Sequence, residues 1–544
     1  MLKRLIAAAL VLCVTPALWA EKPALVVFVV VDQLRGDLPL QYMDRFGEKG
    51  FRRFLDHGTV YTDAHYRHAI TFTACGHATL ATGGNPREHG IIGNDWNDIA
   101  TGQSMYCTQD ETHKLLGAQT ATSAGTSPRN LLVPTLGDAL VEATGGQSRV
   151  FGVSGKDRGA ILMAGHKGKA FWFSNATGGF VTSDYYYEAY PEWVTAFNTP
   201  VPADAYAGKV WSLVRPESEY VNPDVREVEL PNAVIGGTFP HSLEGLDARK
   251  LYSTLSVTPF SDELTVAFAK AIIEHEQLGQ RGTTDLLTVS LSATDIIGHQ
   301  FGPESREQED NLLRLDALLG GFFDYLEATF DKEKLIIALS ADHGVDGNPG
   351  GKPTGQLDPA AVAQAAKNAL KAKFGAEEEY VQVFNDPYVN FTPALIEARP
   401  GDIAAMEDVA AAAIREVPGV AYAIPAHKIV AGELDAENPI MEMVTRAFRP
   451  GVSGNVYVVQ EAYHRVFSGA PSTTATHGTP YPYDTHVPVM FWGAGIGAHR
   501  LDDKAGPEDI TPTLAALLGI ATPSGATGES LAAAVAPSAA STKH

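Results

Sequence analysis

The segment Ala24-Leu-Val-Val-Phe-Val-Val-Val-Asp32 decides the fold class of this chain. Seven consecutive apolar residues, most of them β-branched, separate Ala24 from Asp32. A continuous apolar run of this length predicts a strand, Ala24–Val31, that is buried on both faces of a parallel sheet. Similar runs follow at Arg149–Val153, Leu286–Leu291, Leu335–Leu339 and Val487–Trp492.

Helical patterns lie between these runs. Asp310–Phe323 places leucines along one face, and Asp509–Leu518 begins with an aspartate and is followed by Gly519. Strands that alternate with helices predict an α/β fold with a doubly wound, mostly parallel sheet and helices on both faces.

Three segments depart from this pattern. Residues 170–261 are rich in aromatic residues and proline, and we expect a cap insertion there. Residues 360–450 mix alanine-rich helices with a strand at Tyr380–Phe384 and predict a smaller subdomain. The Ala/Ser/Pro-rich end, 532–544, predicts a flexible tail.

The N-terminus has the pattern of a secretory signal peptide over residues 1–20. Lys3 and Arg4 precede a short apolar run that ends at Val14, and small residues lie near Ala20. The alternative, a membrane anchor, would need about 20 apolar residues, so no stable membrane insertion is expected after cleavage. The mature chain, 21–544, is therefore expected to be periplasmic or secreted. Whether Cys75 and Cys107 pair in that oxidising environment is left open by the sequence.

The composition is that of a globular protein, with 45% hydrophobic and 19% charged residues among 544. A formal net charge of −23 argues against binding to nucleic acid, which needs a basic surface. An anionic small substrate remains compatible, because a bound metal reverses the local charge. A monomer is also compatible with the sequence, which carries no indication of oligomeric state.

Carboxylate and imidazole groups recur at or near the ends of the predicted strands, where functional residues gather in doubly wound sheets. Three aspartates and three histidines make six candidate ligands, a set that suits two Zn²⁺ ions: Asp32, Asp295, His299, Asp342, His343 and His477. Taken singly, each of these residues has a structural alternative, since a strand-end aspartate often caps a helix and a lone histidine is usually a structural hydrogen-bond partner.

Thr73 is the candidate nucleophile, just before a helix predicted to begin near Gly76. A helix N-terminus favours an anion, and a metal can deprotonate a hydroxyl. The alternative role for Thr73 is that of a helix N-cap. Thr71 is a second candidate, and His77 is expected to be structural rather than a ligand.

These motifs together resemble the alkaline phosphatase superfamily and, more narrowly, the threonine-nucleophile alkaline phosphatases of the PafA/PhoK type. The resemblance rests on seven stretches in order: Asp32-Gln33, Thr73–His77, His89–Trp96, Gly155–Arg158, Asp295–His299, Asp342–Gly344 and His477–Tyr481.

The resemblance implies a role for each residue. One Zn²⁺ would be held by Asp32, Asp342 and His343 together with Thr73, and the other by Asp295, His299 and His477. The phosphoryl oxygens would meet Asn94, Lys156 and Arg158, a set that favours phosphate monoesters over diesters. The alternative for Lys156-Asp157-Arg158 is a solvated turn.

Some alternatives remain beside this assignment. His486 competes with His477 as the last ligand, and Asp484 is expected to be structural. Cys75 invites a sulfatase interpretation, but the Cys-x-Pro-x-Arg signature is absent from the sequence. Other hypotheses are a phosphodiesterase or nucleotide pyrophosphatase on the same fold, an exported phosphate-binding protein and a cofactor-independent mutase; the last would need a cytosolic location and usually a serine.

Overall fold

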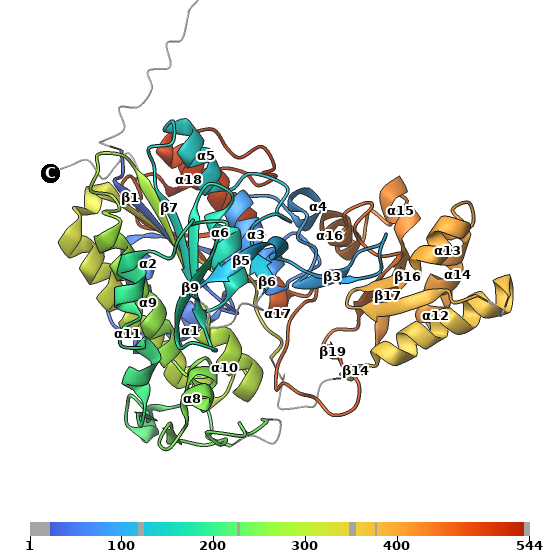
Figure 1. Cartoon of the computed structure of the whole chain (residues 1–544), viewed down its shortest axis with the longest axis horizontal. Helices are drawn as coiled ribbons and strands as arrows, with labels where there is room; N and C mark the ends of the chain where they lie inside the picture. Colours follow the sequence, from blue (N-terminus) through green and yellow to red (C-terminus); the bar gives the residue numbers. More distant parts are fainter. Residues whose placement is uncertain (1–21, 118–123, 226–228, 348–354, 376–377, 538–544) are drawn as a thin grey trace, which may run out of the picture.

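The computed structural model describes residues 22–117, 124–225, 229–347, 355–375 and 378–537. Its main feature is an 11-stranded sheet with the order β21-β2-β20-β13-β1-β12-β7-β8-β9-β5-β6 (Figure 1). The central strands are β13 (Leu335–Ser340), β1 (Leu25–Val31), β12 (Asp285–Leu291) and β7 (Val150–Ser154). They pair in parallel, so the predicted fold class is confirmed.

The flanks of the sheet are mixed in direction. The Val487–Trp492 run forms β20 (Val489–Gly493), which is antiparallel to both of its neighbours. The remaining strands are β2 (Thr59–Ala64), β21 (His499–Ala505), β8 (Lys169–Ser174), β9 (Gly179–Ser183), β5 (Gln109–Leu116) and β6 (Ala124–Thr126).

Helices cover both faces of the sheet, as β1 requires. Its alternate residues Leu25, Val27, Val29 and Val31 enter one apolar core, and Val26, Phe28 and Val30 enter another. The first core includes α2 (Phe51–His57), α9 (Phe260–His275) and α11 (Arg306–Thr329). The second includes residues of α3 (Thr73–Thr82), α5 (Leu136–Ala143) and α18 (Ile510–Leu518).

The expected insertion at 170–261 starts inside the main sheet, because β8 pairs with β7 and β9 pairs with β8. After β9 come α7 (Glu192–Phe197), β10 (Val210–Trp211), β11 (His241–Ser242) and α8 (Ala248–Leu255). Aromatic rings of this region pack around Phe268 of α9, among them Phe171, Phe180 and Trp193. Much of its aromatic content therefore serves core packing.

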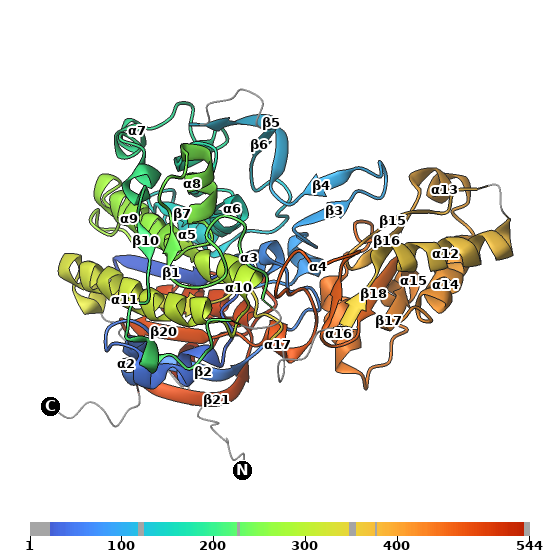
Figure 2. The same cartoon turned by 90° about the horizontal axis from the view of Figure 1, so that it is seen from below.

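A smaller unit stands beside the main body in both views (Figures 1 and 2). Its four-stranded sheet has the order β15-β16-β18-β17. The strands are β15 (Val381–Asn385), β16 (Tyr388–Phe391), β17 (Val420–Pro425) and β18 (Val456–Gln460), and α12 (Pro359–Phe374) and α14 (Ile403–Ile414) share their apolar core. Since β18 lies beyond residue 450, this unit extends further than the sequence pattern suggested.

A hairpin of the main body joins the two units. It consists of β3 (Asp95–Asn97) and β4 (Ser104–Tyr106) and lies between them in Figure 2. The Asn385 amide of β15 donates to Asn97 Oδ1 at 3.2 Å.

The structure describes most of the C-terminal segment but not the predicted signal peptide. In the expected tail, α19 (Ala532–Val535) buries Val535 in the second core and Gly497 donates a backbone hydrogen bond to it, so the tail packs against the main body there. Residues 538–544 and the predicted signal peptide, 1–20, lie outside the described residues. Within the described ranges, no helix combines the length and apolarity that crossing a bilayer requires.

Candidate active site

The candidate site lies at the carboxyl ends of the central strands. Asp32 directly follows β1, and Asp342 and His343 follow β13. Asp295 and His299 lie on α10 (Ala293–Phe301), which begins just after β12. Parallel strands end at the same edge of a sheet, so residues far apart in sequence meet there.

Asp32, Asp342 and His343 form one triplet. Each offers a ligand atom within 4.8 Å of the others, and all three side chains are fully buried. His343 Nε2 lies 3.5 Å from Asp32 Oδ1 and 3.4 Å from Asp342 Oδ2.

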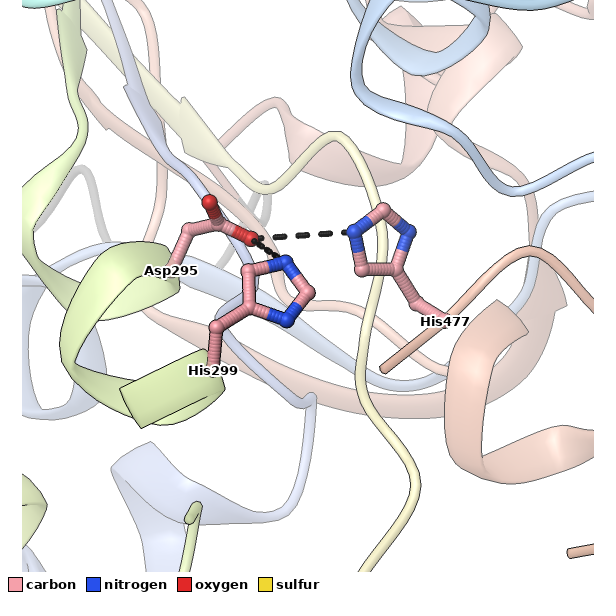
Figure 3. Close-up of side chains that lie close together, drawn as sticks. All are labelled: Asp295, His299 and His477. Atoms are coloured by element: carbon pink, nitrogen blue, oxygen red, sulfur yellow. Dashed lines mark ion pairs between the residues drawn. The ribbon is translucent and has the colours of Figure 1, made fainter. Parts of the chain in front are cut away.

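Asp295, His299 and His477 form a second triplet with the same spacing limit (Figure 3). The Oδ1 atom of Asp295 lies 3.1 Å from His299 Nε2 and 3.7 Å from His477 Nε2. Spacing of four residues on α10 places Asp295 and His299 on one helix face. The rings of His343 and His477 stack with centroids 3.5 Å apart, so the two triplets adjoin.

Buried oxygens in the first triplet test whether these residues fit a metal. Both oxygens are inaccessible: Asp32 Oδ1 has no hydrogen-bond donor among the described residues, and Asp342 Oδ2 faces the rings of His77 and His343 at 3.2 and 3.4 Å. Burial, followed by the charges of Asp295 and Asp342, raises the pKa of Asp32 well above its ordinary value. An orphaned buried carboxylate is costly unless a cation compensates it, and aspartate with imidazole is a donor set that zinc accepts. The residues of this triplet therefore fit a divalent metal ion such as zinc.

Two of the three imidazoles are held neutral, because burial lowers the pKa of His343 and, with the neighbouring histidines, lowers that of His477 well below its ordinary value. Burial also opposes protonation of His299, but Asp295 raises its pKa. A neutral ring keeps a lone pair for a metal. The other nitrogen of His477, Nδ1, lies 2.7 Å from the Thr71 carbonyl, and His299 Nδ1 lies 2.7 Å from that of Ala475. These contacts orient the rings.

Thr73 is the first residue of α3, which begins earlier than expected. The N-cap position belongs to Phe72, so the N-cap role considered for Thr73 is wrong. The Thr73 hydroxyl lies 3.4 Å from His343 Nε2 and 3.5 Å from Arg158 Nη2. Gly76 permits this position, because a Cβ there would lie 1.9 Å from the Asp342 carbonyl.

Three further polar residues contact either the start of α3 or the triplets. Asn94 accepts the Ala74 backbone N–H at 2.9 Å, which ties it to the first turn of α3. Lys156 caps α6 (Asp157–Ala164) and places its Nζ 2.5 Å from both Asp32 and Asp295. Arg158 points at Thr73 from the first turn of α6. The alternative of a solvated turn at 156–158 is therefore wrong.

Lys156 and Asp295 stabilise each other's charged forms. Burial opposes the charge on Lys156, but Asp295 and Asp32 prevail and raise its pKa. Burial likewise opposes ionisation of Asp295, yet His299 and Lys156 hold its pKa well below the ordinary value. The Lys156 ammonium therefore bridges the two triplets.

The other candidates from the sequence have structural roles. The Thr71 hydroxyl donates to the Thr479 carbonyl at 2.9 Å and so supports the His477 loop. Asp484 accepts hydrogen bonds from the backbone and hydroxyl of Thr479. His486 stacks on His65 and lies outside both triplets.

His77 and the two cysteines are also outside the triplets. His77 contacts the Thr73 carbonyl and the Ser290 hydroxyl, each at 2.8 Å. These contacts tie the first turn of α3 to β12. Cys75 and Cys107 are buried free thiols.

Two positioning contacts were missed by the sequence analysis. Gln33 donates from its side chain to Asp295 at 2.7 Å and from its backbone to Asp342 at 3.1 Å, linking the triplets. Its φ of 68° is unusual for a residue other than glycine. The position of Gln33 next to Asp32 could have indicated a role in the site. Its partners could not be predicted, because they lie hundreds of residues away in the sequence.

The second contact is a buried ion pair between Asp346 and Arg465, which we call the clasp. Asp346 pairs with Arg465 Nε at 2.6 Å and accepts the Thr476 backbone N–H at 2.7 Å. Thr476 precedes His477, so the clasp fixes that ligand's loop. The sequence held no indication of this pairing.

Two candidate metal-binding triplets that both contact Lys156, next to a hydroxyl at the start of a helix, are the pattern of a metal-dependent hydrolase on an alkaline-phosphatase-like fold. The family model of type I phosphodiesterases / nucleotide pyrophosphatases matches residues 26–458. The chain is 37% identical over 529 residues to a protein named calcium-transporting ATPase from Myroides odoratus, covering 95% of each. It is 36% identical over 536 residues to alkaline phosphatase PafA from Elizabethkingia meningoseptica, covering 95% of this chain and 97% of PafA.

The crystal structure of wild type PafA matches with a TM-score of 0.86 at 35% identity, covering 94% of this chain and 99% of PafA. A second PafA structure, with the same TM-score, carries substitutions of one threonine, one asparagine, one lysine and one arginine, in that order. The chain therefore belongs to the type I phosphodiesterase / nucleotide pyrophosphatase family and, within it, to the alkaline phosphatases of the PafA type. The family resemblance inferred from the sequence motifs is confirmed.

Proposed function

We propose that this protein is an exported, zinc-dependent phosphomonoesterase that forms a covalent phosphothreonine at Thr73. The observation that carries the proposal is that Lys156 contacts both triplets while Arg158 contacts the Thr73 hydroxyl. Export rests on the sequence pattern of residues 1–20. The substrates would be small phosphate monoesters.

The triplets would each hold one zinc ion, Asp32, Asp342 and His343 in one case and Asp295, His299 and His477 in the other. When bound, such ions supply positive charge to oxygens at the reacting phosphorus and make a hydroxyl more acidic.

Thr73 would attack phosphorus with its hydroxyl oxygen. The bond between phosphorus and the ester oxygen breaks, and the alcohol leaves on the opposite side. Water then attacks phosphorus and the bond to the Thr73 oxygen breaks, which releases inorganic phosphate and restores the threonine hydroxyl. Arg158, 3.5 Å from the attacking oxygen, is placed to bind a phosphoryl oxygen next to it.

Selectivity for monoesters follows from the cations. A monoester dianion has three terminal oxygens, and Lys156, Arg158 and the Asn94 amide offer charged or polar donors to those. In a diester, one of these three oxygens carries a second substituent. That oxygen is then uncharged and would bind less strongly to Lys156 or Arg158. The four residue types substituted in the PafA variant have the same order and sequence separations as Thr73, Asn94, Lys156 and Arg158, which supports these assignments.

The second candidate is phosphodiester or nucleotide pyrophosphate hydrolysis, which the description of the matching family names. The deciding experiment compares kcat/KM for an aryl phosphomonoester and its matching diester with zinc-loaded protein at roughly pH 8–9. We expect a strong monoester preference. A diester preference would replace the proposed activity with phosphodiesterase activity.

A further inference from the structure

A polar pocket of about 260 Å³ opens next to the triplets. Its inner wall includes His477 of the second triplet, Asn94 and Phe72, which precedes the nucleophile. In-line displacement expels the alcohol on the side opposite Thr73. Because His477 belongs to the triplet farther from Thr73 in the proposed division of roles, this pocket is suited to the leaving group.

The outer wall of the pocket comes from the smaller unit. Asn385 ends β15, Asp386 follows it, and Gln460 ends β18. The pocket is thus built from two units, and the smaller one supplies three polar side chains that an alcohol could meet beyond its ester oxygen.

Two of these groups are free to bind a ligand. The Asp386 carboxylate makes no hydrogen bond or ion pair with any residue in the described parts of the chain, and the Gln460 side-chain amide likewise has no described partner. Burial raises the pKa of Asp386 to about 7. The carboxyl is therefore ionised under alkaline conditions, and a cation beside it would favour that state further.

A second carboxylate reinforces the charge. Asp95, on the same pocket, lies 3.4 Å from the Asn385 amide, which also binds Asn97. Among the residues that line the pocket there is no lysine or arginine. The wall thus carries negative charge and hydrogen-bonding groups without a compensating cation.

We propose that this pocket selects the alcohol portion of the substrate, favouring phosphomonoesters whose leaving group carries an ammonium group over those whose leaving group carries a further anion, with Asp386 as the main determinant. The inference rests on the proposed phosphomonoesterase function and deepens it. Gln460 would hydrogen-bond to the same part of the leaving group.

The test uses three small substrates of similar size: 2-aminoethyl phosphate, 2-hydroxyethyl phosphate and phosphoglycolate. Their leaving groups are cationic, neutral and anionic. The kcat/KM values are measured for zinc-loaded wild type, Asp386→Asn and Gln460→Glu. Because each variant is compared on the same substrates, differences in intrinsic reactivity cancel.

For Asp386→Asn we expect the ratio of the cationic to the anionic substrate to fall about tenfold, with the neutral substrate changed by less than about twofold. Gln460→Glu adds a charge and should raise that ratio. Glu416→Gln is the matched control, since Glu416 is exposed on the same unit and away from the pocket, and it should leave the ratio unchanged.

Binding gives a second readout that does not need turnover. Thr73→Ala, with and without Asp386→Asn, is titrated with 2-aminoethyl phosphate and phosphoglycolate by calorimetry, and the same shift in the affinity ratio is expected. An unchanged ratio in the Asp386 and Gln460 variants would overturn the inference while leaving the proposed function intact. Failure of wild type to hydrolyse any of the three monoesters would instead overturn the proposed function and the inference with it.

Discussion

Lys156 gives the sharpest test of how the site recognises phosphate. Its Nζ lies 2.5 Å from Asp32 Oδ2 and from Asp295 Oδ2, and its side chain is 11% exposed. Lys156→Met removes the charge and keeps most of the side-chain length. The fold and the ligand residues themselves are left in place.

The expected loss follows from the value of one buried, charged contact to a transition state, about 3 kcal/mol. At about 1.4 kcal/mol for each tenfold change, kcat/KM for an aryl phosphomonoester should fall by about 150-fold. For the matching diester the oxygen that faces Lys156 carries less charge, so we expect a fall of less than about tenfold. The ratio of the two kcat/KM values is therefore the quantity that changes.

The assay measures both substrates with zinc-loaded protein, after circular dichroism and metal analysis have shown that fold and zinc content are retained. Lys167→Met is the control, because Lys167 pairs with Glu142 on the surface and its side chain is 45% exposed. Equal losses for monoester and diester, or no loss at all, would refute the role given to Lys156.

Three further predictions follow from the structure. Thr73→Ala should lower kcat/KM by about a thousandfold or more while zinc content, measured by mass spectrometry, stays that of wild type; unchanged turnover would contradict nucleophilic attack by Thr73. Asp346→Asn should weaken zinc retention about tenfold in a chelator competition, because the ion pair that fixes the His477 loop is lost; equal retention would argue against the clasp. Burial raises the pKa of Glu508 from 4.5 to about 7, so the unfolded chain ionises first and the free energy of unfolding should fall by about 3 kcal/mol between pH about 4.5 and 7. Glu508→Gln should remove that loss in denaturant titrations at pH 5 and pH 8, whereas the exposed control Glu48→Gln should behave as wild type.

Much of the fold could be predicted because the central strands are continuous apolar runs. The run before Asp32 became β1, and the helix expected at Asp509–Leu518 became α18 (Ile510–Leu518). The prediction was poorer where strands lie near an edge. β8 and β9 were assigned to an insertion, since an aromatic-rich stretch indicates burial without saying which sheet buries it.

The candidate site was predictable to the extent that its residues carry distinctive chemistry in a familiar order. The six candidate ligands fall into the two expected groups of three. The start of α3 at Thr73 was less predictable, because helix boundaries depend on capping contacts that the sequence shows weakly. The roles of the site residues in binding and catalysis stay predictions.

The sequence by itself determined the α/β class, the family and the set of chemically capable residues. Those depend on local apolarity and on side-chain type, which are properties of each segment alone. Only the tertiary structure decided how the groups meet: Lys156 between Asp32 and Asp295, Arg465 on Asp346, and Asp386 facing the pocket beside His477. Such pairings join segments many residues apart, and they are set by how the packed sheet and the smaller unit bring strand ends and loops together, which no local pattern encodes.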